Sequence, residues 1–373
     1  MIFFSFMLIT PLLPLYLSET YQVDKETIGL VLSGYTLTAL LARPFSGYLV
    51  DSLPRRVVLL TSYFLFFAMF AGYLIAGTMT LFAIVRTMHG APMGAVTVAN
   101  STCAIDVLHP SRRAEGIGYY GLSNNLATSI APTVGLMVYD ATSNYNILFI
   151  LCLVTAGIGL AINATVKIPQ KELVTNHDPI SLDRFFLVEG WSEGLVMICI
   201  GMSYGVLATY LAIYGKEELG ILTGTGAWFA VLSGGLILSR IIGVRSLRKG
   251  KVVENVNHGI IVSLFGYLLF ATLHNPIGYY GAALIIGLGN GHIWPGMQTM
   301  FIDLAPHTKR GTANSTQLIS WDIGMGLGVV FGGVAAHHFG YGAAFWLAFA
   351  VNLLGVAFYY AYVKNHFITH RVR

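Results

Sequence analysis

Some ionisable side chains lie inside long apolar stretches of the sequence, and three of them are at positions where they could move a proton. Asp322 falls about ten residues into the stretch 312–336, roughly 15 Å deep at a rise of about 1.5 Å per residue. Arg86 lies near the start of an earlier stretch, and His292 lies at middle depth in a later one. A carboxyl group buried in this way must be protonated or paired, and an unperturbed imidazole titrates near neutral pH. Asp322, Arg86 and His292 are therefore our candidates for carrying or relaying a proton.

Each of these candidates also has a purely structural interpretation. The Asp322 carboxyl group can form a fixed hydrogen bond to a neighbouring helix, and His292 can be a hydrogen-bonded core histidine. Arg86 can extend its guanidinium group toward the membrane surface or donate to free carbonyl groups. At the level of sequence, both interpretations stay open.

Polar and aromatic side chains accompany these candidates at similar depth. They are Asn124, Asn125, Asn290, Trp294, Gln298 and Trp321. If the helices that carry them face one another, these side chains line a central cavity with aromatic rings, amide groups and few charges. Such a lining suits an amphipathic or aromatic solute better than a highly charged one.

A second group combines glycine, carboxylates and arginines at the ends of apolar stretches. Its members are Gly47, Asp51, Arg55, Arg56, Asp106, Arg113, Asp303 and Arg310. A carboxylate at such a place can pair with arginine and with a helix N-terminus. We expect these residues to form a cytoplasmic latch that opens when two halves of the molecule move apart. The alternative is that the arginines only set the membrane orientation and bind anionic lipid headgroups.

The elements that must position these residues are membrane-spanning helices. Of the 373 residues, 55% are hydrophobic and 10% are charged, against about 25% charged in an average soluble domain. This composition excludes a soluble enzyme, a nucleic-acid-binding protein and a disordered chain. Apolar stretches of about 18 residues or more predict twelve transmembrane helices. Their approximate ranges are 1–18, 27–50, 57–77, 80–105, 115–138, 145–166, 190–214, 223–244, 256–274, 279–303, 312–336 and 341–363.

The basic residues predict the orientation of these helices in the membrane. Of the 21 lysines and arginines, two fall in odd-numbered loops, three within spans, and the other sixteen in even-numbered loops and the C-terminal tail. Loops that face the cytoplasm carry an excess of lysine and arginine. We therefore expect both termini to be cytoplasmic.

An internal repeat relates the two halves of the chain. At one offset of 197 residues, the matched positions include Arg43 and Arg240, Gly90 and Gly287, Gly94 and Gly291, Asp106 and Asp303, and Gly135 and Gly332. Since both halves begin on the same side, they are parallel repeats about an axis along the membrane normal. We predict six-helix bundles at 1–166 and 190–373, the second with a short cytoplasmic tail, joined by a cytoplasmic connector at 167–189.

The repeat also leads to expectations about the start of each half. The position that matches the start of the seventh span would fall before residue 1, so we expect native residues to precede Met1. Glu189 and Glu193 lie at the cytoplasmic start of the seventh span. We expect both carboxylates to be solvated residues of a gate.

Several motifs resemble those of the major facilitator superfamily. The motif at 47–56 has a glycine, an aspartate four residues later and then a basic cluster, although serine stands where the family has a basic residue after the aspartate. The motif at 86–90 is similar to the family's Arg-x-x-x-Gly of helix 4. The stretch 110–127 resembles the helix 4–5 region of bacterial efflux members. The stretch 131–135 is similar to the Gly-Pro motif of antiporters, with alanine in place of the first glycine.

The resemblance implies an all-α integral membrane fold of twelve transmembrane helices in two pseudo-symmetric six-helix bundles. It also implies a multi-pass transporter of the bacterial inner membrane, similar to drug/proton antiporters. We expect proton-coupled efflux of a small organic or amphipathic compound by alternating access. An uptake symporter for a sugar or other small metabolite is one alternative, and a non-transporting membrane sensor or scaffold is another.

The sequence offers no catalytic constellation, metal-binding spacing or nucleotide-binding loop. Its three cysteines have no CxxC spacing. We therefore expect a protein that is not an enzyme, has no cofactor or metal, and acts as a monomer. Its expected partners are a small-molecule substrate, protons and membrane lipids, with no nucleic acid.

Overall fold

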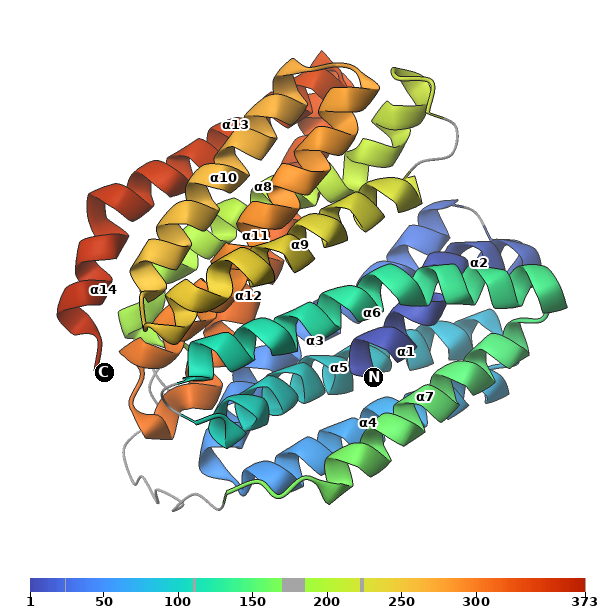
Figure 1. Cartoon of the computed structure of the whole chain (residues 1–373). Helices are drawn as coiled ribbons and strands as arrows, with labels where there is room; N and C mark the ends of the chain where they lie inside the picture. The colour runs from blue at the N-terminus through green and yellow to red at the C-terminus, as the bar shows by residue number, and fades with distance from the viewer. Residues whose placement is uncertain (24, 110–111, 170–184, 222–224, 373) are drawn as a thin grey trace. The chain divides into compact units, whose positions relative to one another are not determined.

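The computed structural model describes residues 1–23, 25–109, 112–169, 185–221 and 225–372, which are almost entirely helical (Figure 1). Within these ranges there is no strand. When Ile2–Tyr21 and Tyr341–His370 are each taken as one interrupted helix, the described residues form twelve long helices. The predicted number of helices is therefore confirmed, and all-α is the correct fold class.

The chain divides into two compact units, and each is described by itself. Unit 1 consists of Met1–Val107, Ser123–Phe186 and Thr308–Ser315. Its first helix is broken at a short 3₁₀ turn because Pro11 and Pro14 cannot donate backbone hydrogen bonds. The helices that begin in the first half of the chain are α1 (Ile2–Ile9), η1 (Thr10–Leu12), α2 (Leu13–Tyr21), α3 (Lys25–Ser52), α4 (Arg55–Ile75), α5 (Met79–Val107), α6 (Arg113–Thr142) and α7 (Tyr145–Thr165).

Unit 2 consists of Leu108–Leu122, Leu187–His307 and Thr316–Arg373. A five-residue π-helix interrupts its last long helix. The elements that begin in the second half of the chain are η4 (Val188–Gly190), α8 (Trp191–Glu217), α9 (Thr225–Arg248), α10 (Val252–Thr272), α11 (Pro276–Leu304), η5 (His307–Lys309), α12 (Arg310–Phe339), α13 (Tyr341–Phe358), η6 (Tyr359–Val363) and α14 (Lys364–His370).

The two units differ from the predicted bundles by two short exchanged segments. The first part of α6 is assigned to unit 2, and the first six residues of α12 belong to unit 1. Helix α12 therefore begins in one unit and continues in the other. The predicted division at 166 and 190 stays a prediction, and most of the connector at 167–189 lies outside the described residues.

Helix packing repeats between the units. In unit 1, α3 packs along α5, α4 packs against α5 and α7, and α1 packs against α7. In unit 2, α9 packs along α11, α10 packs against α11 and α13, and α8 packs against α13. Each contact in one unit has its counterpart in the other, helix by helix, as the internal repeat requires.

Glycines at matched positions explain why the packing repeats. A Cβ atom on Gly90 would overlap the carbonyl oxygen of Tyr35, and a Cβ atom on Gly287 would overlap that of Leu232. Tyr35 and Leu232 are themselves separated by the repeat offset. In both units a glycine thus lets two helix backbones approach to direct contact.

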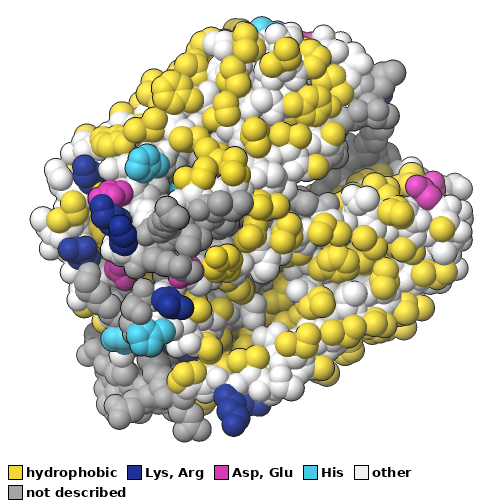
Figure 2. All heavy atoms as spheres, viewed as in Figure 1, with side chains coloured by type: hydrophobic (Ala, Val, Ile, Leu, Met, Phe, Trp, Pro, Cys, Tyr) yellow, Lys and Arg dark blue, Asp and Glu magenta, His cyan; other side chains and the backbone are white. Residues whose placement is uncertain are grey.

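Apolar side chains cover the outer flanks of the helices. Leu30, Ile75 and Ile277 are each more than 70% exposed, and Figure 2 shows hydrophobic atoms along the visible helices of both units. Seven helices in the described residues are long and apolar enough to cross a membrane. Since exposed apolar surface of this extent is stable only against lipid or another protein, it indicates a multi-pass membrane protein.

Candidate functional site

The carboxylate of Asp51, at the end of α3, lies against the first turn of α12. Its Oδ1 accepts a hydrogen bond from the Gly311 backbone N–H at 2.9 Å. Its Oδ2 accepts from the Thr312 backbone N–H at 2.8 Å and from the Thr312 hydroxyl at 3.0 Å. The first N–H groups of a helix lack partners within the helix, and a negative charge there interacts favourably with the helix dipole. Asp51 therefore caps a helix that begins about 260 residues later.

Two arginines share a second carboxylate, that of Asp106 at the end of α5. Arg310 Nη1 donates to Asp106 Oδ1 at 2.8 Å, and Arg55 Nη1 pairs with Asp106 Oδ2. Arg55 Nη2 also lies 3.5 Å from Asp51 Oδ1. All four side chains are less than a tenth exposed. Because two carboxylates face two guanidinium groups, the charges compensate, which limits the cost of burying them. We call these four residues the Asp51 cluster.

The cluster depends on close contact between α3 and α12. A Cβ atom on Gly311 would lie 2.7 Å from the Gly47 carbonyl oxygen and 3.1 Å from the Asp51 carboxyl group. A Cβ atom on Gly47 would lie 2.7 Å from the Ser315 Cβ. Any larger residue at either position would push the two helices apart and lengthen the hydrogen bonds to Asp51.

Further polar contacts hold the next turn of α12. The Asn314 side chain is fully buried, and its Nδ2 donates to the Ser101 hydroxyl and lies 3.3 Å from the Val98 carbonyl oxygen. The Ser315 hydroxyl donates to the Arg43 carbonyl oxygen at 3.0 Å. The beginning of α12 is thus fixed to α3 and α5 by a continuous set of hydrogen bonds.

The predicted latch residue Arg56 has partners outside this cluster. Arg56 instead donates to the Ala164 carbonyl oxygen at 2.6 Å and to that of Val166 at 3.3 Å, at the C-terminal end of α7. Its guanidinium group therefore compensates the negative end of a helix dipole within unit 1. Arg113 and Asp303 belong to unit 2.

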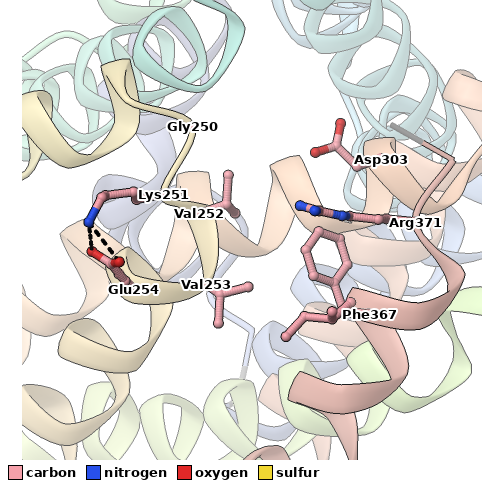
Figure 3. Close-up of a pocket in the computed structure, with 9 residues that line it drawn as sticks. Gly250, Lys251, Val252, Val253, Glu254, Asp303, Phe367 and Arg371 are labelled. Carbon is pink, nitrogen blue, oxygen red and sulfur yellow. Dashed lines mark hydrogen bonds and ion pairs between the residues drawn. The ribbon is translucent and has the colours of Figure 1, made fainter.

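Asp303 lines a pocket of about 270 Å³ at the end of α11 (Figure 3). The exposed Arg371 extends into this pocket between Asp303 and Phe367, and the Val372 N–H donates to the Asp303 carbonyl oxygen at 2.8 Å. On the other wall, Lys251 pairs with Glu254 at 2.8 Å. The chain's C-terminal end is therefore attached to the end of α11.

Arg86 lies in a buried aromatic environment within unit 1. Its guanidinium carbon lies 4.1 Å from the centre of the Tyr35 ring and 5.5 Å from that of Phe6, and the side chain is 3% exposed. Nη1 donates to the Tyr73 hydroxyl at 3.4 Å, and this hydroxyl lies 2.9 Å from His89 Nδ1. Among the described residues, no carboxylate pairs with Arg86. Ring faces and phenol oxygens thus compensate a buried cation.

Asp322 follows Trp321, which belongs to a group of aromatic rings within unit 2. The Trp321 ring centre lies 5.2 Å from that of Trp294 on α11 and 5.5 Å from that of Tyr204 on α8. Asp322 and Trp321 are both half-buried, so a solute or water molecule can reach them. Helix α12 therefore carries a carboxyl group directly after a tryptophan whose ring contacts aromatic rings of α8 and α11.

His292 is held by one neighbouring side chain. Its Nδ1 lies 2.8 Å from Asn255 Oδ1, and Asn255 Nδ2 donates back to the His292 carbonyl oxygen at 2.8 Å. This reciprocal pair is what a hydrogen-bonded core histidine would show. Its role in proton transfer stays a prediction.

The remaining cavity candidates are distributed over two helices. Asn290 accepts a hydrogen bond from Ser263 at 3.4 Å, and Gln298 is buried on α11. Asn124 is half-buried on α6, and the side chain of Asn125 lies outside the described residues. Asn124 and Asn125 belong to unit 1, and Asn290 and Gln298 belong to unit 2.

Sequence reasoning missed the burial of Glu193. Glu189 is exposed, as expected of a solvated gate residue, but the Glu193 side chain is fully buried. The expectation for Glu193 is therefore wrong. Its partner His366 lies 173 residues away on α14, a contact that no local pattern reveals.

Comparison with known proteins identifies related sequences along the whole chain. A family profile for the Major Facilitator Superfamily matches residues 1–289 and 256–370. A staphylopine export protein of Staphylococcus aureus is 22% identical over 321 residues, covering 82% of this chain and 79% of the relative. The multidrug resistance protein MdtG of a Rahnella species is 23% identical, covering 95% and 89%. The multi-drug resistance efflux pump PmrA of Streptococcus pneumoniae is 22% identical, covering 92% and 88%.

Solved structures share the fold. The human organic anion transporter MFSD10 superposes with a TM-score of 0.81 at 16% identity, over 96% of both chains. The transporter FucP in its outward conformation superposes with a TM-score of 0.77, also at 16% identity and over 96% of both chains. Both likenesses concern the fold alone.

Proposed function

Because this chain belongs to the major facilitator superfamily, we propose that it exports a small organic or amphipathic compound across the membrane in exchange for protons. It is a membrane transporter, and its relatives with multidrug resistance and export names support the outward direction. We place it in the bacterial inner membrane as a monomer, with both termini in the cytoplasm.

The observation that carries the proposal is the group of aromatic rings formed by Trp321, Trp294 and Tyr204, with the half-buried Asp322 next to Trp321 in the sequence of α12. Aromatic faces bind apolar and cationic organic groups without requiring a fixed pattern of hydrogen bonds. A carboxyl group in such a place gains or loses a proton according to whether a solute or water lies next to it. Proton binding and solute binding are then linked because both involve the same few atoms.

Arg86 is assigned a different part in proton coupling. An arginine stays charged under all relevant conditions, so Arg86 supplies a fixed positive charge rather than a proton. The Tyr73 hydroxyl lies between this charge and His89 within the same buried group. In this proposal Arg86 is a positioning residue, and Asp322 is the proton carrier.

The Asp51 cluster is assigned the role of a latch. Helix α12 carries Asp322 farther along its length, and its first turn is held by Asp51, Arg55 and Asp106. Breaking these contacts frees the beginning of α12, and re-forming them fixes it again. Such a two-state contact is what alternating access requires on the cytoplasmic side.

Transport in proteoliposomes under an imposed pH gradient tests the proposal. We expect a lipophilic organic cation dye to move against the proton flux, and Asp322→Asn to abolish the response to the gradient. Asp140→Asn is the matched control, since Asp140 is an exposed carboxylate at the end of α6. Transport that follows the protons in the same direction would identify an uptake symporter. Proton-driven flux that survives Asp322→Asn would remove Asp322 from the mechanism.

A further inference from the structure

A second buried carboxylate lies far from Asp322 along the chain, in the first turn of α8. The Glu193 side chain is fully buried, and Ser192 Oγ donates to its Oε2 at 2.9 Å. His366 Nδ1, on α14, lies 3.4 Å from Glu193 Oε1 and 3.3 Å from Ser192 Oγ. Carboxylate, hydroxyl and imidazole thus form a closed triangle between α8 and α14.

The elements around this triangle bring no second charged partner to Glu193. The other titratable or charged groups on η4, η6 and α14 are Glu189, Tyr359, Tyr360, Tyr362, Lys364 and His370, and within the described residues only Tyr359 interacts electrostatically with Glu193. The Tyr359 hydroxyl is buried and has no hydrogen-bond partner in the described part of the chain. Phe301 of α11 lies against Gly190, and the Ser320 hydroxyl of α12 lies against Gly194, on either side of Glu193 in the sequence.

In the described part of the chain no lysine or arginine pairs with Glu193, and this fixes the charge balance of the pair. An ionised Glu193 beside a neutral His366 would leave a net negative charge buried among neutral groups, which is costly. One added proton removes this charge, whether it resides on the carboxyl group or on the imidazole. We therefore assign the proton to the pair and not to either residue alone.

The imidazole gives the pair a route to solvent. The His366 side chain is 8% exposed, whereas that of Glu193 is not exposed at all. The His366 ring stacks between the exposed rings of Tyr362 and His370, with ring centres 5.5 Å and 4.4 Å away. A proton can therefore reach the buried carboxyl group through an imidazole at the surface.

We propose that Glu193 and His366 form a proton-binding site, which takes one proton from the solvent and holds it between α8 and α14. The site is separate from the coupling role assigned to Asp322. Loss of the proton leaves a buried negative charge at the contact and so weakens the packing of α14 against α8. The proposal does not depend on which solute is transported or in which direction.

Infrared difference spectroscopy of the purified protein during a pH titration tests for proton binding. We expect titrating carboxyl or imidazole bands that Glu193→Gln loses. Glu189→Gln is the matched control, because Glu189 lies four residues earlier and is exposed. It should keep these bands. Identical titrations of wild type and Glu193→Gln would overturn the proposal.

A second variant keeps the test decisive if Glu193→Gln does not fold. His366→Asn retains the carboxyl group but removes the cation that favours its ionised form. The carboxyl band should then persist to higher pH than in wild type, and His370→Asn should leave it unchanged. A carboxyl band that is indifferent to His366→Asn would contradict a shared proton.

The transport assay separates this inference from the proposed function. If the wild type moves protons and solute, Glu193→Gln should flatten the pH dependence of the rate while Asp322→Asn abolishes coupling. If no transport is found, the infrared titration still decides whether the pair binds a proton. A pH dependence that is unchanged in Glu193→Gln, in a protein that transports, would overturn the assignment.

Discussion

The two halves of the molecule repeat the same helix packing but not the same chemistry at the ends of the matched helices. In unit 1, the Asp106 carboxylate is buried with two arginines, Arg55 and Arg310. In unit 2, the matched Asp303 is half-buried at a pocket that the exposed Arg371 enters from the C-terminal tail. Valine stands at position 252, which the repeat matches to Arg55.

Glycine distribution shows the same asymmetry. Gly47 and Gly311 permit the close contact of α3 with the start of α12, whereas the repeat-matched positions are occupied by Val244 and Ala114. The glycines that set the long helix contacts, such as Gly90 and Gly287, are present in both halves. The fold is thus symmetric where backbones must touch. The charge pairing is asymmetric at the Asp51 cluster, which is the contact that we propose to open and close.

The largest effect should come from removing the carboxylate that both arginines share. Asp106→Asn leaves two buried guanidinium groups without their common partner, and we expect a loss of about 3 kcal/mol in the free energy of unfolding. Asp303→Asn, at the matched position, should cost about 1 kcal/mol or less because its neighbour Arg371 is exposed. Unfolding of the purified protein in mixed micelles measures both changes.

Equal losses for the two variants would remove the asymmetry. They would show that ion pairing of Asp303 contributes as much to the free energy of unfolding as ion pairing of Asp106 does. A transport assay gives a second measurement, since Asp106→Asn should lower the transport rate more than Asp303→Asn does.

The next effect concerns the close contact of α3 with α12. Gly311→Ala places a Cβ atom against the Gly47 carbonyl oxygen and the Asp51 carboxyl group, and we expect a loss of about 2 kcal/mol. Gly326→Ala, farther along the same helix, meets open space and should be neutral or stabilising by about 0.5 kcal/mol. Thermal unfolding midpoints of the two variants give the comparison.

A neutral Gly311→Ala variant would show that α12 can shift away from α3 without cost. The Asp51 cluster would then be too loose to act as a latch. The Gly326→Ala variant controls for the general effect of alanine on helix stability, so only the difference between the two midpoints bears on the contact.

Sequence reasoning predicted the features that depend on local or periodic patterns. Apolar length predicted the twelve helices, and the constant offset predicted two parallel repeats. The Gly90–Tyr35 and Gly287–Leu232 contacts agree with that offset. A glycine permits close contact between two backbones because it has no Cβ atom. Its role could therefore be inferred without knowing which distant residue it contacts.

The partners of individual side chains were harder to predict because they depend on segments far apart in the chain. Arg56 and Arg55 are adjacent in sequence, yet Arg56 caps α7 while Arg55 joins Asp106. Since neighbouring side chains on a helix point about 100° apart, adjacency in sequence does not imply a shared partner. The burial of Glu193 was not predicted for a related reason. Its partner His366 lies on α14, 173 residues later in the chain.

A smaller effect should follow from removing one of the hydrogen bonds from α12 to Asp51. Thr312→Val keeps the shape of the side chain and the backbone N–H but loses the hydroxyl that lies 3.0 Å from Oδ2. We expect a loss of about 1.5 kcal/mol, the usual range for a hydrogen bond to a charged group. Thr369→Val, at an exposed site on α14, is the control. A null result would mean that the backbone donors alone hold Asp51.

The smallest effect is expected at Arg56, which lies outside the Asp51 cluster. Arg56→Ala removes the donor to the Ala164 and Val166 carbonyl oxygens at an exposed helix end, so we expect a loss of about 0.5 kcal/mol that shrinks further at high salt. Arg112→Ala removes an exposed arginine without that contact and should change nothing. Unfolding at low and high salt separates the two. If Arg56→Ala instead matched Asp106→Asn in stability and in transport rate, Arg56 would belong to the latch after all, and the cluster would have to be redrawn to include the end of α7.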